Sequence, residues 1–174
     1  IPAGKLWSDG QPATSEDVRF SLQPLLDAAA SEAGAMCLGY IDPYLTNAGV
    51  TAVTAPDPQT VVVSLSRAND RILKTYVPIL PAHIWKSKVE SLCDDQFSPP
   101  IVGSGPYQAQ EWQTGQFVRF TKNPNWTAGD LAAEEVVIQF FKTEDTMAQA
   151  LRSGELDYAQ NILSDQFDQL TGVE

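Results

Sequence analysis

The chain has 174 residues, a length that suits one ordinary domain or two small units. Hydrophobic residues make up 43% and charged residues 19%, as in globular proteins, and no apolar run is long enough to predict a transmembrane helix. The formal net charge is −11, and the 11 lysines and arginines form no basic stripe. We therefore expect a monomer that binds neither nucleic acid nor an anionic membrane surface.

The first part of the chain predicts a helix followed by a hairpin. A turn at residues 7–12 precedes a helix that Thr14 is expected to cap. Its buried face is expected to carry four apolar residues at helical spacing, Val18, Leu22, Leu25 and Leu26. Pro24 has no amide proton, so we expect the helix to kink or restart there. Residues 50–55 and 60–66 then predict two strands joined by a turn.

The rest of the chain mixes predicted strands and helices. Residues 77–80 predict a short strand, residues 82–89 a short helix, and residues 94–100, which end in two prolines, a linker. The elements expected after the linker are strands at 107–112, 116–122 and 135–141, a helix at 143–153 ended by Gly154, a strand at 156–159 and a helix at 164–170. Strands alternating with helices predict the α/β class (mixed α+β).

The sequence offers little for catalysis. His83 is the only histidine, and residues 81–85 around it are typical of the start of a short helix. Residues 103–106 (GSGP) match neither the Gly-x-Ser-x-Gly elbow of hydrolases nor a phosphate-binding glycine motif. Histidine, cysteine and carboxylate residues do not occur at metal-ligand spacing. We therefore expect no enzyme, no metal and no cofactor, with a hydrolase as the least favoured alternative.

Five segments together resemble one protein family. They are WSDGQPATSEDV at residues 7–18, APDPQTV at 55–61, ILPAHIW at 79–85, VGSGPY with KNPNW at 102–126, and ALRSGELD at 150–157. In this order they resemble the signatures of family 5 extracellular solute-binding proteins, which serve ABC transporters of peptides and nickel. The sequence differs mildly from the family's usual pattern at Ser15, Ser104, Lys122 and Trp126, and Pro24 is its least typical residue.

The resemblance implies part of a periplasmic-binding-protein-like type II fold. Residues 1–98 would form most of the family's smaller α/β domain, truncated at its N-terminus, and residues 99–174 part of the first large lobe. The second large lobe would follow Glu174, so we expect the sequence to be a fragment that binds no peptide tightly by itself. A natural chain end at Glu174 would instead favour a stand-alone structural or interaction module.

The function that the resemblance implies is the solute-binding component of an ABC importer. Such a protein captures a peptide-like solute outside the cytoplasm, in the periplasm or at the cell surface, and delivers it to a membrane permease. Lobe closure around the solute is the expected mechanism. The location is compatible with a lipoprotein anchored through a missing N-terminus. Peptides, nickel chelates, opines and oligosaccharides all occur as solutes in the family.

The resemblance also implies residues that face the solute. Tyr40 and Tyr76 would stack on a peptide or hydrogen-bond to it, and Lys74 would pair with a carboxylate. Gln160 and Asn161 follow the strand predicted at 156–159, and ligands of open α/β sheets bind beyond strand ends. The alternative for each residue is ordinary packing or solvated surface.

The expected oxidation state of the two cysteines depends on the cellular compartment. Export implies a disulfide between Cys37 and Cys93, whereas two free thiols are expected in the cytosol.

Overall fold

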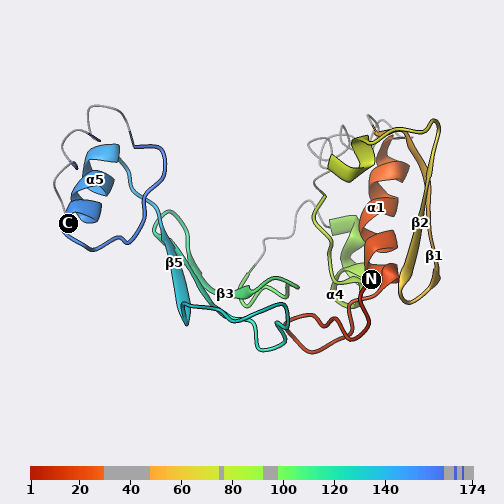
Figure 1. Cartoon of the computed structure of the whole chain (residues 1–174), viewed down its shortest axis with the longest axis horizontal. Helices are drawn as coiled ribbons and strands as arrows, with labels where there is room; N and C mark the ends of the chain where they lie inside the picture. Colours follow the sequence, from red (N-terminus) through yellow and green to blue (C-terminus); the bar gives the residue numbers. More distant parts are fainter. Residues whose placement is uncertain (30–47, 75–76, 92–97, 163–166, 168–169, 171–174) are drawn as a thin grey trace.

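The computed structural model describes residues 1–29, 48–74, 77–91 and 98–162, together with Phe167 and Leu170. Its elements form two groups along the longest axis of the molecule (Figure 1). The N-terminal unit contains α1 (Ser15–Ala29), β1 (Val50–Asp57), β2 (Thr60–Leu65), the 3-10 helix η1 (Arg71–Lys74), α4 (Ala82–Trp85) and the 3-10 helix η2 (Lys86–Ser91). The sheet unit contains β3 (Tyr107–Gln113), β4 (Phe117–Lys122), β5 (Glu135–Gln139) and α5 (Glu144–Arg152).

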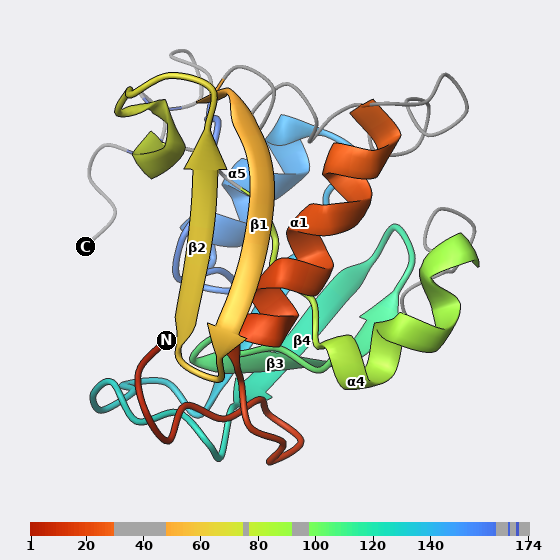
Figure 2. The ribbon, with the colours of Figure 1, turned by 90° about the vertical axis from the view of Figure 1, so that its right-hand side faces the viewer.

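Helix α1 organises the N-terminal unit. It packs against both strands of the β1–β2 hairpin and against α4 (Figure 2). One buried cluster joins α1 to the hairpin and consists of Leu22, Ala48, Val50 and Val53, with Val18 and Leu26 packed beside it. A second cluster joins α1 to α4 and consists of Phe20, Ala82 and Trp85. The helix therefore buries two sets of side chains, which is more than the single predicted stripe.

The proline in α1 does not end the helix. The helix is continuous from Ser15 to Ala29 with Pro24 inside it, so the predicted restart is wrong. Proline at this position leaves the carbonyl of Phe20 without its helical amide donor. Leu22 is buried against the hairpin and Phe20 against α4. The free energy gained by this burial outweighs the local cost of the proline, because tertiary packing supplies most of the stability of helices in proteins.

The β1–β2 hairpin is antiparallel, as predicted, and pairs Val53 with Val63. Its turn is built around Asp57, whose Oδ1 accepts hydrogen bonds from the amides of Gln59 (2.9 Å) and Thr60 (3.0 Å). These hydrogen bonds, that of Gln59 first, hold the pKa of Asp57 below its usual value. The amide of Ser15 donates to the carbonyl of Pro58 at 2.9 Å, so the turn also fixes the start of α1.

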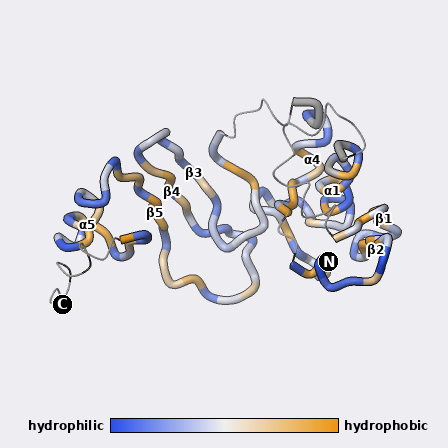
Figure 3. The backbone as a smooth tube through the Cα atoms, turned by 90° about the horizontal axis from the view of Figure 1, so that it is seen from above, coloured by the Kyte–Doolittle hydropathy of each residue, from blue (hydrophilic) through white to orange (hydrophobic). Residues whose placement is uncertain are grey.

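The sheet unit is an antiparallel meander in the order β3-β4-β5. Its hairpin and its third strand confirm the predictions at 107–112, 116–122 and 135–141. Helix α5 also confirms its prediction: Thr143 caps it by accepting from the amide of Thr146, and Gly154 follows it with a left-handed φ of +77°. Apolar residues lie along β4 and β5 (Figure 3), and all five residues of β5 are exposed.

Two predicted strands are absent from the structure. Residues 77–80 and 156–159 pair with no other strand within the described ranges, and both predictions are wrong. A strand needs a neighbour for its backbone amides and carbonyls, and apolar composition alone does not supply one. The helix predicted at 82–89 is α-helical only in α4 and continues as η2. Residues 94–97 of the linker and most of the helix predicted at 164–170 lie outside the described residues.

The mixed α and β class is confirmed, and each strand pairing within the described residues is antiparallel. In the described parts of the chain, no helix combines the length and the apolar character that a bilayer crossing would need.

Candidate functional site

The segment at residues 7–12 forms a tight turn beside the N-terminal unit. The amide of Trp7 donates to the carbonyl of Gln11 at 2.8 Å, and the amide of Gly10 donates to the carbonyl of Trp7 at 2.9 Å. Gly10 has a φ of +85°, a conformation that favours glycine. The side chain of Trp7 is only 2% exposed, so burial of its indole anchors the turn.

Asp17 connects this turn to both helices of the N-terminal unit. Its Oδ2 accepts from the amide of Thr14 at 2.7 Å and from Nε1 of Trp7 at 3.3 Å. Its Oδ1 accepts from the amide of Ala82 at 2.8 Å, at the first residue of α4. Asp17 is 4% exposed, so these two amides and the indole share one buried carboxylate. The hydroxyl of Thr14 also donates to Asp17 (3.4 Å), which reverses the capping direction expected for Thr14.

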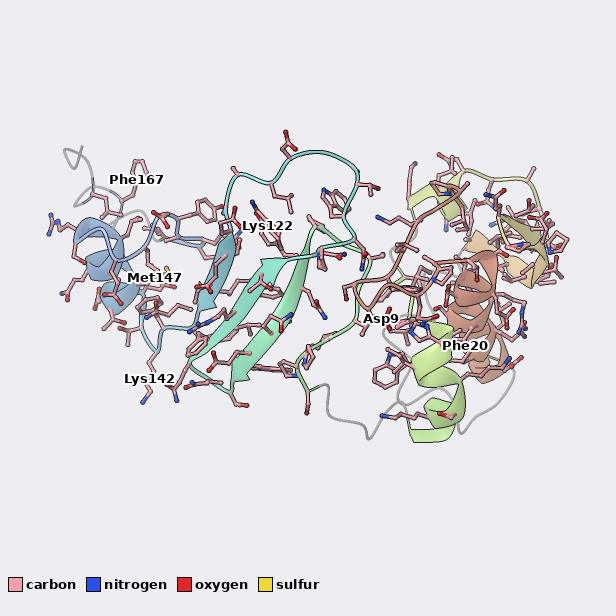
Figure 4. The ribbon with its side chains drawn as sticks, turned by 90° about the horizontal axis from the view of Figure 1, so that it is seen from below. Asp9, Phe20, Lys122, Lys142, Met147 and Phe167 are labelled. Carbon is pink, nitrogen blue, oxygen red and sulfur yellow. The ribbon has the colours of Figure 1, made fainter. Side chains whose placement is uncertain are left out.

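His83 holds the same turn from α4. Its Nε2 lies 2.7 Å from Oδ2 of Asp9, and Oδ1 of Asp9 accepts from the amide of Gln11 at 3.1 Å. Partial burial raises the pKa of Asp9, but the contacts with His83 and Gln11 outweigh it and leave the pKa below its usual value. Asp9 lies beside α4, on the side of the N-terminal unit that faces the sheet (Figure 4). This contact gives His83 a structural partner.

Asn125 joins the turn to the sheet unit, and Asn123 makes a further hydrogen bond beside it. The side-chain amide of Asn125 donates to the carbonyls of Trp7 (3.0 Å) and Ser8 (3.1 Å). The side-chain amide of Asn123 donates to the carbonyl of Gly105 at 2.8 Å. Three of the five family-like segments therefore meet at one place, which we call the junction: Trp7, Ser8, Asp9, Asp17, His83, Gly103, Asn123 and Asn125.

The junction connects elements by hydrogen bonds. Its groups are backbone amides and carbonyls, two asparagine amides, an indole, a hydroxyl, two carboxylates and an imidazole. Among the described residues, no group of three or more His, Cys, Asp or Glu side chains is placed to hold a metal ion. Holding two units together is what this arrangement does chemically.

The residues predicted to face the solute lie in separate places. Lys74 ends η1, with Nζ 2.9 Å from Oδ2 of Asp70, and its side chain is 75% exposed. Gln160 and Asn161 are exposed and follow α5, and Asn161 has a φ of +60°. Helices η1 and α5 belong to different units, and they lie toward opposite ends of the longest axis (Figure 1). The described part of the chain therefore does not bring Lys74 and Asn161 together.

The other residues that the sequence analysis singled out are two tyrosines and two cysteines. Tyr40, Tyr76, Cys37 and Cys93 all lie outside the described residues. Gln160 and Asn161 do not follow a strand, because residues 156–159 are not a strand within the described chain. Their role as solute contacts stays a prediction that rests on the family resemblance.

An apolar hollow that the sequence analysis missed lies next to the junction. It has a volume of about 280 Å³ and is lined by Ile101, Gly103, Tyr107, Ala109, Trp112, Val118 and Phe120. The β3–β4 register pairs Ala109 with Phe120 and Trp112 with Val118, so these side chains share one face. The alternation of Tyr107 with Ala109 and of Val118 with Phe120 was the available signal.

The junction was also missed, although part of it is visible in the sequence. The pair Thr14 and Asp17 has the spacing of a capping box, in which an acidic side chain reaches back to the residue before the helix. The contact from Asp17 to Ala82 spans 65 residues and that from Asn125 to Trp7 spans 118. No local pattern predicts contacts at such separations.

Two solved structures of solute-binding proteins are similar to the chain in fold. The structure of the oligopeptide-binding protein AppA from Bacillus subtilis, in complex with a nonapeptide, matches 100% of this chain with a TM-score of 0.83 at 19% identity. The structure of NikZ from Campylobacter jejuni, in complex with Ni(L-His), matches 90% of the chain with a TM-score of 0.74 at 20% identity. These two likenesses show the fold.

The family model described as "Bacterial extracellular solute-binding proteins, family 5 Middle" matches residues 3–173, and the chain belongs to this family. A relative from Brucella ovis, named "Putative ABC transporter peptide-binding protein", is 28% identical over 156 residues, which are 87% of this chain. The chain spans about 28% of the length of that relative, 34% of AppA and 30% of NikZ.

Proposed function

We propose that the chain is part of an extracytoplasmic solute-binding protein that captures a peptide-like solute and delivers it to an ABC permease. The match of the family model over residues 3–173 carries this proposal. The name of the Brucella relative and the nonapeptide in the AppA complex favour a peptide over other solutes. In this role the chain binds and releases its solute without catalysis.

Two observations support the domain assignment that we propose. Residues 1–98 correspond to most of the smaller domain and residues 99–174 to part of the first large lobe. The clusters of Leu22 and Phe20 give the first range a core of its own, and the β3-β4-β5 sheet lies wholly in the second. The second large lobe lies outside this sequence in the proposal, and closure would bring it over the solute.

The proposed solute contacts are Tyr40, Lys74, Tyr76, Gln160 and Asn161. Lys74 is paired with Asp70 at the surface, and an exposed ion pair is worth at most about 1 kcal/mol, so a solute carboxylate can compete for it. Asn161 offers both a donor and an acceptor to a peptide backbone. We further propose a monomer, a Cys37–Cys93 disulfide and attachment to the cell surface through a lipid.

Binding measurements on the longest natural form of the protein test this function. In titration calorimetry with peptides of two to nine residues, we expect binding at micromolar concentration or tighter. Residues 1–174 alone are expected to bind far more weakly, because one side of the pocket is missing. Tight binding by residues 1–174 would place the whole site inside them.

Alanine variants then test the residues. Asn161→Ala and Lys74→Ala are each expected to weaken binding by about 1–3 kcal/mol. Lys142→Ala, at an exposed lysine of the sheet unit, is the matched control and is expected to bind as the unchanged protein does. If the protein bound a nickel chelate and none of the peptides, the peptide proposal would be rejected in favour of a solute like that in the NikZ complex.

A further inference from the structure

The two units are joined mainly by loops. Among the described residues, close packing between helices and strands runs from α1 to β1, β2 and α4, and from β4 to β3 and β5, always within one unit. Hydrogen bonds and a cation–π contact between the units come instead from residues 5–8 on one side and from residues 103 and 125–126 on the other. These contacts therefore help to fix the orientation of the two units.

Asn125 makes the most specific of these contacts. One side-chain nitrogen donates to two consecutive carbonyls, those of Trp7 and Ser8, at 3.0 and 3.1 Å. Asn125 is itself oriented by Asn123, whose Oδ1 accepts the amide of Asn125 at 2.9 Å. Asn123 is 4% exposed and also donates to the carbonyl of Gly105, so its own position is fixed. The donor is thus held in place from the sheet unit.

Ser8 and Gly103 reinforce the contact. The amide of Ser8 donates to the carbonyl of Gly103 at 2.9 Å, and the amide of Gly103 donates to Oγ of Ser8 at 3.2 Å. Nζ of Lys5 lies 4.5 Å from the ring centre of Trp126, which adds a cation–π contact. These contacts all act on the segment that contains Trp7, and Trp7 is tied to Asp17 and through it to α4.

We propose that Asn125 is a positioning residue: together with the Ser8–Gly103 pair, its side-chain amide locks the N-terminal unit in one orientation against the sheet unit. The lock reaches both helices of the N-terminal unit because Asp17 connects Trp7 to them. Its importance for solute binding rests on the proposed function, since surfaces held in a fixed orientation lose less entropy when a ligand binds.

Asn69 provides a matched control inside one unit. Its side-chain nitrogen also donates to two carbonyls, those of Ala48 and Arg67, both at 2.9 Å. Its Oδ1 accepts the amide of Arg71 at 2.9 Å. Asn69→Asp and Asn125→Asp therefore make the same chemical change, in which a two-bond donor becomes a carboxylate that faces carbonyl oxygens. Only the second change lies between the units.

The experiment is a distance measurement by pulsed electron resonance on the 174-residue chain. Spin labels are attached through p-acetylphenylalanine at Val62 of β2 and Val137 of β5, both 47% exposed, so that the cysteines stay unmodified. We expect one narrow distance distribution in the unchanged chain and in Asn69→Asp. We expect a broad or shifted distribution in Asn125→Asp, with its circular dichroism retained.

A narrow, unshifted distribution in a folded Asn125→Asp variant overturns the proposal. If that variant does not fold, Ser8→Ala decides, because it removes only the acceptor for the amide of Gly103. Broadening in Ser8→Ala supports the lock, and an unchanged distribution overturns it. No solute is needed for this measurement, so its failure would leave the proposed binding function in place.

Discussion

The N-terminal unit and the sheet unit use similar apolar strands in opposite ways. In the first, α1 covers β1 and β2, and Val53 is 4% exposed. In the second, β5 exposes its apolar residues: Val136 is 37% exposed, Val137 47% and Ile138 49%. Val136 and Ile138 pair with Phe120 and Val118, so the face that contains the hollow continues onto β5.

The difference shows that the apolar composition of a strand does not determine whether the strand is buried. Strand formation depends on the residues and on a neighbouring strand, whereas burial depends on what packs over the sheet. The described residues supply a cover for the β1–β2 hairpin and leave the side chains of β5 exposed. Truncating one apolar residue in each unit should make this contrast measurable.

Leu22→Ala is expected to have the largest effect. Leu22 is 7% exposed in the cluster between α1 and the hairpin, so its truncation should cost about 2–5 kcal/mol of unfolding free energy. Val137→Ala is the control in the sheet unit and should cost less than about 1 kcal/mol, because Val137 is already 47% exposed. Urea denaturation followed by circular dichroism measures both. Equal losses would mean that the two units are packed alike.

Asp17→Ala is expected to have the next largest effect. It leaves the indole of Trp7 and the amides of Thr14 and Ala82 without their common acceptor, at a cost of about 2–3 kcal/mol. Asp27→Ala is the matched control on the same helix, because Asp27 is exposed and accepts a local hydrogen bond from the side chain of Gln23. It should change stability by less than about 0.5 kcal/mol. A loss confined to Asp27→Ala would contradict the role given to Asp17.

The smallest expected effect concerns Asp9 and depends on pH. The pKa of Asp9 in the folded chain lies below the usual 3.8. The charged carboxylate therefore stabilises the fold at pH values above 3.8, and this contribution is lost as the pH falls through the lowered pKa. Asp9→Asn should therefore reduce stability at pH 7 by less than about 1 kcal/mol, because the contact is partly exposed. The gap between the two proteins should close toward pH 2.

Urea titrations of both proteins at pH 7, 4 and 2.5 provide the measurement. Leu22→Ala is the control, since it removes no titratable group and its cost should not follow the protonation of Asp9. A constant difference between the unchanged chain and Asp9→Asn across this range would show that the carboxylate charge contributes nothing to the contact with His83.

Local signals predicted most of the elements. The hairpins, β5 and α5 were predicted because alternation, turn residues and the glycine stop at Gly154 act over a few neighbouring residues. Pro24 misled the prediction of α1, because the burial of Phe20 and Leu22 outweighs a local penalty. At residues 156–159 the sequence predicted an element that the structure lacks, because a strand also needs a partner strand that composition does not reveal.

The site was predicted less well than the fold. The resemblance named the segments that form the junction, but a motif does not state which of its side chains touch one another. The sequence analysis included Asp17 only as one residue of the segment at 7–18. The structure adds its contacts with Trp7 and Ala82, which join distant parts of the chain.

The sequence separation of the junction contacts has a consequence for folding during synthesis. The hairpins pair residues that are close in sequence and can form as soon as they are made. Ser8 must wait for Gly103, 95 residues later, and the carbonyl of Trp7 must wait for Asn125, 118 residues later. At about 5–20 residues per second on the ribosome, this delay lasts roughly 5–24 seconds. During that interval the first turn of the chain stays without the contacts that fasten it to the sheet.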